Sequence, residues 1–95
     1  MMTITYAHWL KARLEEADLI RFGSSAGAAE LLGVTRPTLW RWLRGHTSPS
    51  GDQLLRIAAA FAGNDHKRFA QLLLEQVSVK AIGTTDYKQY LAGAE

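Results

Sequence analysis

Three arginines and two tryptophans lie within the stretch "GVTRPTLWRWLRG", residues 33–45, which contains no acidic residue. Arginine carries a permanent charge and a planar fork of donors that matches phosphate oxygens and the O6 and N7 edge of guanine. Residues 31–51 hold Arg36, Arg41 and Arg44 and no Asp or Glu, whereas the remainder holds eight basic and nine acidic residues. The positive charge is therefore local, which is typical of a surface that binds phosphate, although solvated surface helices carry similar runs.

The spacing within this stretch predicts two different faces if residues 36–44 form a helix. At about 100° per residue, Leu39 and Trp42 share one side, whereas Arg41 and Arg44 point to nearly the opposite side. An apolar side packs in a core, and a cationic side left in solvent can enter the major groove of DNA, where an α-helix fits. We therefore expect one tryptophan to anchor this helix and the arginines to be available for nucleic acid.

Glycine and capping residues predict a short helix before this one and a tight turn between the two. An alanine-rich helix is expected over residues 25–32, and Gly33 permits the turn because it has no Cβ. Thr35 suits an N-cap, and Pro37 is tolerated in a first helical turn. Two short helices joined in this way form a helix-turn-helix. The residues expected to face the core are Ala28, Leu32, Val34, Leu39 and Trp42.

Apolar residues at helical spacing predict three further helices around this pair. One covers about residues 6–19, one begins at a capping box of Ser50 with Gln53, and one covers about residues 65–77. Their expected core positions are Tyr6, Trp9, Leu10, Leu14 and Ala17 in the first, Leu54, Ile57, Ala58 and Phe61 in the second, and Phe69, Leu72, Leu73 and Gln76 in the third.

The segment after residue 77 has a weaker pattern. "VSVKAI", residues 77–82, alternates like a short strand, and "TTDYKQYLAG", residues 84–93, fits one or two helical turns. We therefore divide the chain into a domain over residues 1–78 and a C-terminal extension over residues 79–95. Within the extension, an apolar stripe either folds back on the core or contacts a second copy; it comprises Tyr87, Tyr90 and Leu91. Alternatively, a strand edge is offered to a second copy by Val77, Val79 and Ala81.

The stretch "SAGAAELLGVTRPTLWRWLRGHTSPSGDQLLRIAAAFAG" resembles the phage repressor/Cro class of helix-turn-helix regulators, the Xre family. The resemblance covers roughly residues 6–76. It implies an all-α, five-helix lambda-repressor-like domain, here with a short C-terminal extension, that binds double-stranded DNA. The features that carry it are Ala29, Gly33, Val34, Leu39, Trp42, Gly45, Pro49 and the run Leu54, Leu55, Ile57 and Ala58.

The resemblance also implies which residues meet DNA. Base contacts are implied for Arg36, Pro37, Thr38, Trp40 and Arg41. Phosphate contacts are implied for Ser24, Ser25, Thr35, Arg44, His46, Thr47 and Ser48. For Trp40, three roles stay open: a contact in the groove or to a sugar, a dimer contact, and packing against the loop that follows.

The remaining composition argues against other classes of function. The chain has no cysteine, which excludes disulfides and thiolate metal sites. His8, His46 and His66 are scattered without acidic residues at ligand spacing, and no serine has a base beside it. We therefore expect no metal, no cofactor and no catalytic activity. The first residues lack the pattern of a signal peptide and no run is long enough for a membrane span, so we expect a cytoplasmic protein.

The expected function is sequence-specific binding of operator DNA by a homodimer that acts as a transcriptional repressor, in a phage, plasmid or other mobile element. Two alternatives remain. One is the antitoxin of a toxin–antitoxin pair, which would add a protein partner to the same DNA-binding module. The other is a helix-turn-helix that binds protein and not DNA, which the retention of arginines without acidic neighbours disfavours.

Overall fold

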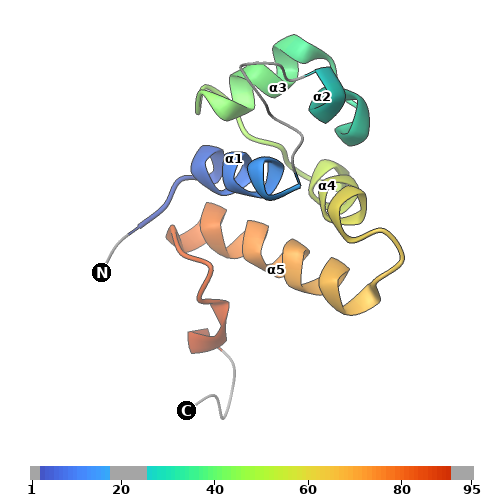
Figure 1. Cartoon of the computed structure of the whole chain (residues 1–95). Helices are drawn as coiled ribbons and strands as arrows, with labels where there is room; N and C mark the ends of the chain where they lie inside the picture. Colours follow the sequence, from blue (N-terminus) through green and yellow to red (C-terminus); the bar gives the residue numbers. More distant parts are fainter. Residues whose placement is uncertain (1–2, 18–25, 91–95) are drawn as a thin grey trace.

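The computed structural model of the chain describes residues 3–17 and 26–90, and within these ranges all regular secondary structure is helical (Figure 1). The elements are α1 (Tyr6–Glu16), α2 (Ala26–Leu32), α3 (Arg36–Leu43), α4 (Asp52–Ala62), α5 (His66–Ile82) and the 3-10 helix η1 (Tyr87–Tyr90). The predicted all-α class with five α-helices is therefore confirmed. None of these helices combines the length and apolarity needed to span a membrane.

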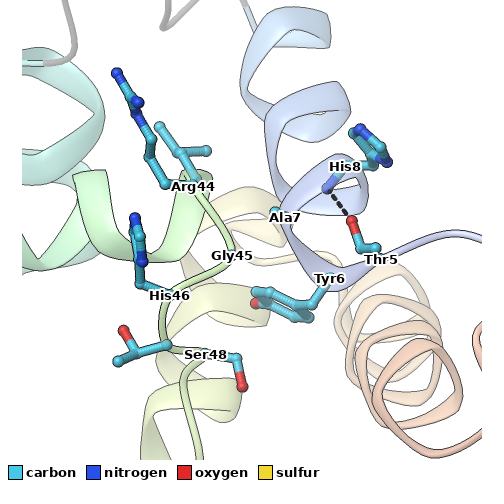
Figure 2. Close-up of a pocket in the computed structure, with 10 residues that line it drawn as sticks. Thr5, Tyr6, Ala7, His8, Arg44, Gly45, His46 and Ser48 are labelled. Carbon is cyan, nitrogen blue, oxygen red and sulfur yellow. Dashed lines mark hydrogen bonds between the residues drawn. The ribbon is translucent and has the colours of Figure 1, made fainter.

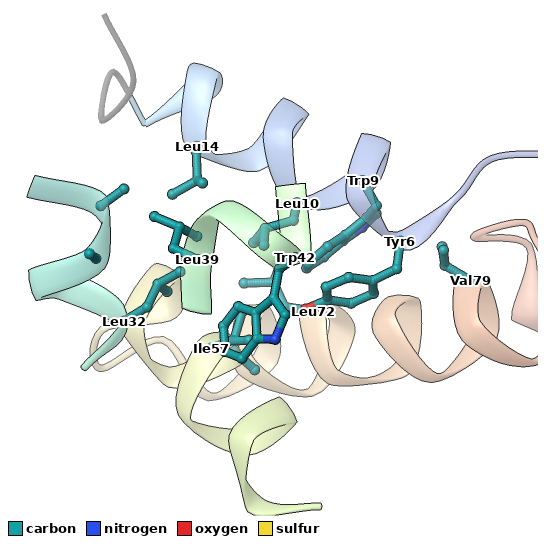
Figure 3. Packing of buried hydrophobic residues seen from close by; sticks show 13 residues of the cluster. Tyr6, Trp9, Leu10, Leu14, Leu32, Leu39, Trp42, Ile57, Leu72 and Val79 are labelled. Carbon is teal, nitrogen blue, oxygen red and sulfur yellow. The ribbon is translucent and has the colours of Figure 1, made fainter. Parts of the chain in front are cut away.

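One hydrophobic core joins the helices, and α1 lies in the middle of it. Figure 1 shows α1 between the α2–α3 pair and α5, while α4 packs along α5. The core residues drawn in Figure 3 include Trp9, Leu10, Leu39, Trp42 and Ile57, all of which the periodicity predicted. Val34, Leu54, Phe61, Phe69 and Leu73 are partly buried around them. Ala17 was expected in the core, but it follows the last turn of α1 and is exposed.

The turn between α2 and α3 has the geometry that the sequence predicts. Gly33 has φ of 70°, a left-handed conformation that a side chain would strain. The N–H of Val34 donates to the carbonyl of Ala29 at 3.0 Å, which closes the turn. Thr35 caps α3 because its hydroxyl accepts from the N–H of Thr38 at 3.3 Å. Caps of this kind contribute about 1 kcal/mol each, and here they fix where α3 begins relative to α2.

The cap of α4 differs from its prediction. The N-cap is Gly51, which makes no side-chain hydrogen bond, and the helix begins at Asp52. Only half of the expected capping box forms: the N–H of Ser50 donates to Oε1 of Gln53 at 3.2 Å. Ser50 lies outside the helix because Gly51 adopts a positive φ that L-residues avoid.

The predicted strand at residues 77–82 is wrong, because α5 continues without a break to Ile82. Six residues are too few to distinguish alternation from one buried helical face. Gln76 and Val79, three residues apart, are buried on that face, and the left-handed Gly83 caps the helix end. The suggested strand edge of Val77, Val79 and Ala81 therefore does not form, and the boundary after residue 78 falls inside α5. The predicted helical turn in the tail is present as η1.

A buried polar network, which sequence reasoning missed, holds α1 against α5. The Tyr6 hydroxyl donates to Oε1 of the fully buried Gln76 at 2.6 Å, and Nε2 of Gln76 donates to the Leu54 carbonyl at 2.9 Å. Nε1 of Trp9 donates to Oε1 of Glu75 at 3.1 Å. Because its ring lies in the core, burial raises the pKa of the Tyr6 phenol. These bonds satisfy polar groups that would otherwise be costly to bury, and they fix the platform on which α3 rests.

Candidate nucleic-acid interface

The two faces of α3 separate apolar from cationic side chains. Leu39 and Trp42 point into the core and are buried, as the sequence predicts. Arg41, on the opposite side, is exposed, and so is Arg44, which forms the C-cap of the helix. Arg36, on a flank of the helix, is exposed too. Because Trp42 and Leu39 fix the rotation of α3, the direction of the arginine side is fixed with it.

Arg36 and Arg41 of α3, and Arg44 at its C-cap, differ from other arginines of the chain in their neighbours. Arg13, Arg56 and Arg68 each lie within ion-pair distance of a carboxylate, with Arg56 at 3.1 Å from Asp52. Within residues 3–17 and 26–90, no carboxylate lies within 4.0 Å of a charged nitrogen of Arg36, Arg41 or Arg44. The described part of the tail packs on α5 and leaves these side chains exposed. Among the residues that the structure describes, nothing neutralises these three charges.

At the C-terminal end of α3, Arg44 and His46 gather on Trp40. The guanidinium carbon of Arg44 lies over the Trp40 ring, 4.3 Å from its centroid. The His46 ring is stacked on the same indole with a centroid distance of 6.1 Å and an interplanar angle of 19°. Half of the Trp40 surface, 50%, stays exposed. Of the three roles left open for Trp40, packing against the loop is present in the free protein.

The N-terminal end of α3 carries the remaining base candidates. Pro37 is exposed in the first turn, next to Arg36. Thr38 is half-buried, and its hydroxyl lies 2.9 Å from the hydroxyl of Thr35. The exposed residues here are therefore Arg36, Pro37 and the N-cap Thr35, whose hydroxyl is hydrogen bonded to that of Thr38.

The loop after α3 and the start of α1 form a groove of about 490 Å³ (Figure 2). His46, Thr47 and Ser48 are exposed along one side, as required of the predicted phosphate contacts. Thr5 and His8 line the other side, and sequence reasoning missed them. Only tertiary packing of α1 on α3 brings these residues, some forty positions apart, to one groove. Ser24 and Ser25, the other predicted phosphate contacts, lie outside the described residues.

The described residues offer no other site of evident chemistry. Across residues 3–17 and 26–90, no three His, Asp or Glu side chains come together in a way that could hold a metal ion. The face of α3 and the groove beside it are therefore the site that the geometry supports, and both are suited to binding phosphate and base edges.

Comparison with known proteins agrees with this geometry. Residues 10–64 match the model of a family described as helix-turn-helix, which covers more than half of the chain and the whole of α2, α3 and α4. Comparisons with curated proteins and with solved structures found no match.

Proposed function

Because the chain belongs to the helix-turn-helix family of the Cro/repressor (Xre) type, we propose that it represses transcription by occupying operator DNA as a homodimer. Binding to double-stranded DNA and regulation of transcription follow from family membership. The repressor role, the operator and the dimer are the proposal. In it, α3 enters the major groove, and phosphate contacts on either side fix its register.

The observation that carries the proposal is the uncovered cationic side of α3. Arg41 projects from the middle of this side and is assigned to a guanine edge, with Arg36, Pro37 and Thr38 toward the helix start. Phosphates are assigned to the residues at its ends and in the loop: Thr35, Arg44, His46, Thr47 and Ser48, together with Ser24 and Ser25 at the start of the second helix. Trp40 directly precedes Arg41 in the sequence and so borders the residues that are assigned to bases.

The homodimer follows from how little DNA one domain can read. Two copies on half-sites about 10 base pairs, or a small multiple, apart would read enough sequence for a specific site. An apolar groove between α5 and η1 supports a contact between copies: Leu74 and Val77 are each nearly half exposed, and Tyr90 is 71% exposed. Figure 1 shows α5 and η1 on the side of α1 away from α3, so a contact there leaves α3 uncovered.

Ending the chain after Gly83 tests this contact, because it removes Tyr87 and Tyr90 from the groove. We expect the shortened chain to dimerise more weakly, measured by sedimentation at micromolar concentration. An unchanged dimer would place the interface elsewhere. Thermal unfolding of the shortened chain serves as the control, since η1 contributes no buried residue to the core.

Selection of duplexes from a random pool tests the DNA-binding proposal. We expect recovered sequences with two related half-sites, and affinity that falls steeply as salt rises, because arginines displace counterions from phosphate. Recovery of no preferred sequence, together with binding to random duplex that salt does not weaken, would favour a helix-turn-helix that binds protein instead.

The same apolar groove supports a second candidate, an antitoxin that uses α3 for DNA and α5 with η1 for a toxin. Co-purification of a small partner encoded beside this chain would favour the antitoxin. Recovery of the chain alone, as a dimer bound to DNA, would favour the stand-alone repressor.

A further inference from the structure

Trp40 is the exposed one of the three tryptophans, and two side chains of the same chain contact its ring. Trp9 is 2% exposed and Trp42 is 3% exposed, whereas half of Trp40 remains in solvent. The Arg44 guanidinium lies 4.3 Å from the Trp40 ring centroid, and the His46 imidazole is stacked on the same ring. Trp40 is therefore half exposed, but part of its surface already contacts an arginine and a histidine in the free protein.

A contact through the ring face leaves the hydrogen-bonding edge of an arginine free. The donors of guanidinium lie in its plane, and an indole face attracts the charge without accepting those N–H groups. A carboxylate partner would instead engage those donors; the Glu16 carboxylate, for example, lies 3.0 Å from Nη2 of Arg13. Arg44 is therefore restrained and still able to bind a phosphate through two hydrogen bonds.

The position of Arg44 along α3 determines where its restrained side chain lies. Arg44 is the C-cap of α3, one turn after Trp40, and His46 follows in the loop that lines the groove of Figure 2. Trp42, which lies between Trp40 and Arg44 in the sequence, is buried and holds the end of the helix in the core. The stack therefore projects from a fixed point at the end of α3, on the side where the predicted phosphate contacts His46, Thr47 and Ser48 lie.

We propose that Trp40 is a positioning residue, which holds Arg44 ready for one backbone phosphate at the C-terminal end of α3 and does not read bases itself. This inference rests on the proposed function, because the phosphate belongs to the DNA that α3 enters. Holding a long side chain in its bound geometry before binding lowers the entropy that binding would otherwise cost. Trp40 thereby raises affinity for every sequence alike and leaves base preference to its neighbours.

A double-mutant cycle on a duplex recovered from the random pool tests the proposal. Trp40→Leu is expected to weaken binding roughly two- to fivefold, the range of an exposed cation–π contact. Arg44→Gln is expected to weaken binding and to lower the slope of log affinity against log salt by about 1. Because Trp40 acts through Arg44, adding Trp40→Leu to Arg44→Gln should cause no further loss, and Trp40→Phe should retain most of the affinity.

Arg41 provides the matched control, because it is exposed on the same helix and no aromatic ring of the described residues lies against its guanidinium. The losses from Trp40→Leu and Arg41→Gln should multiply in the double variant. Equal losses from Trp40→Leu in the unchanged and Arg44→Gln backgrounds would overturn the proposal, because Trp40 would then touch DNA directly. A Trp40→Leu variant that binds as well as the unchanged protein would overturn it too.

An NMR measurement on the free protein separates this inference from the proposed function. The Arg44 side-chain protons should show a ring-current shift that Trp40→Leu removes and Trp40→Phe keeps, with unchanged thermal unfolding. Absence of the shift in the unchanged protein would overturn the stack. If the unchanged protein binds no duplex, the proposed function fails and this inference with it; if it binds and the cycle is additive, the inference alone fails.

Discussion

Two arginine–tryptophan pairs in this molecule differ in their surroundings. In the first, the Arg13 guanidinium lies 6.0 Å from the Trp9 ring centroid, and Glu16 and Glu75 lie 3.0 and 3.7 Å from its nitrogens. In the second, Arg44 lies over Trp40, and no carboxylate pairs with it within the described residues. The residue types are the same, and the pairs differ in the carboxylates beside Arg13 and in the burial of the tryptophan, which is nearly complete for Trp9 and half for Trp40.

This difference separates a contact that holds the fold from a surface that binds. Trp9 is buried and its Nε1 donates to Glu75, which also accepts from Gln71, so the Arg13 charge is balanced where α1 meets α5. Arg44 keeps its charge in solvent on α3. A cation that is paired with carboxylates of its own chain has little charge left for an external anion, whereas an exposed cation without a carboxylate partner can complement one. The predictions below set the α1–α5 side against the outer side of α3.

The largest expected effect contrasts two tryptophans of one helix. Trp42→Ala should lower the free energy of unfolding by about 3–5 kcal/mol, because it empties a buried site. Trp40→Ala, two residues earlier, should change it by only about 0.5 kcal/mol, as at other exposed positions. Urea unfolding of both variants measures this. Similar losses from the two replacements would mean that α3 is rotated differently about its axis.

A smaller effect is expected in binding when the central arginine of α3 is removed. Arg41→Ala should cost about 1–3 kcal/mol on the preferred duplex and relax preference at one base position, because Arg41 is assigned to a guanine edge. Competition binding with duplexes changed at single positions measures both. A uniform loss across all sequences would make Arg41 a phosphate contact.

Replacing Arg13 and Arg44 in two separate variants tests the comparison directly. Arg13→Gln should lower the free energy of unfolding by about 1 kcal/mol, because this partly exposed ion pair is screened by solvent. It should leave duplex affinity nearly unchanged. Arg44→Gln should do the reverse. Urea unfolding and duplex titration of both variants provide the four values, and a loss of affinity in Arg13→Gln equal to that in Arg44→Gln would contradict the division.

An effect that at pH 7 is no larger than the one expected for Arg13→Gln concerns Tyr6, on the α1–α5 side, and it depends on pH. Burial raises the pKa of the Tyr6 phenol, so the folded protein keeps it neutral where the unfolded chain ionises, from about pH 10 upward. Stability from this group is therefore complete below pH 10 and falls as pH rises, by about 1.4 kcal/mol per pH unit at most.

Tyr6→Phe tests this dependence. At pH 7 it should be less stable by about 1 kcal/mol, because the hydrogen bond to Gln76 is lost. The difference from the unchanged protein should shrink between pH 9 and pH 11 in urea unfolding. A difference that stays constant over this range would show that Tyr6 ionises in the folded state as it does in the unfolded chain.

The sequence predicted much of the fold because helical periodicity and capping are local properties. Leu39 and Trp42 were assigned to the core from their spacing alone, and Thr35 to the cap from its type and place. The length of α5 was not predictable, because the alternation of residues 77–82 fits a strand as well as a helix. The helix is favoured by tertiary packing, which buries Val79.

The candidate site also has one part that the sequence predicted and one part that it did not. The exposed side of α3 could be predicted, because it depends on rotation within one helix. The groove between α1 and the loop after α3 could not, because Thr5 and His46 meet only through tertiary packing. The pairing of Glu75 with Trp9 and Arg13 was equally hidden, since it joins residues more than sixty positions apart.

The central claim is that the uncovered arginines of α3 bind the phosphates and bases of duplex DNA. It is tested most directly by measuring duplex affinity over a series of salt concentrations for the unchanged protein and for Arg44→Gln. We predict a linear fall of log affinity with log salt, with a slope smaller by about 1 in the variant. Identical slopes in both proteins, or affinity that does not depend on salt, would contradict the account.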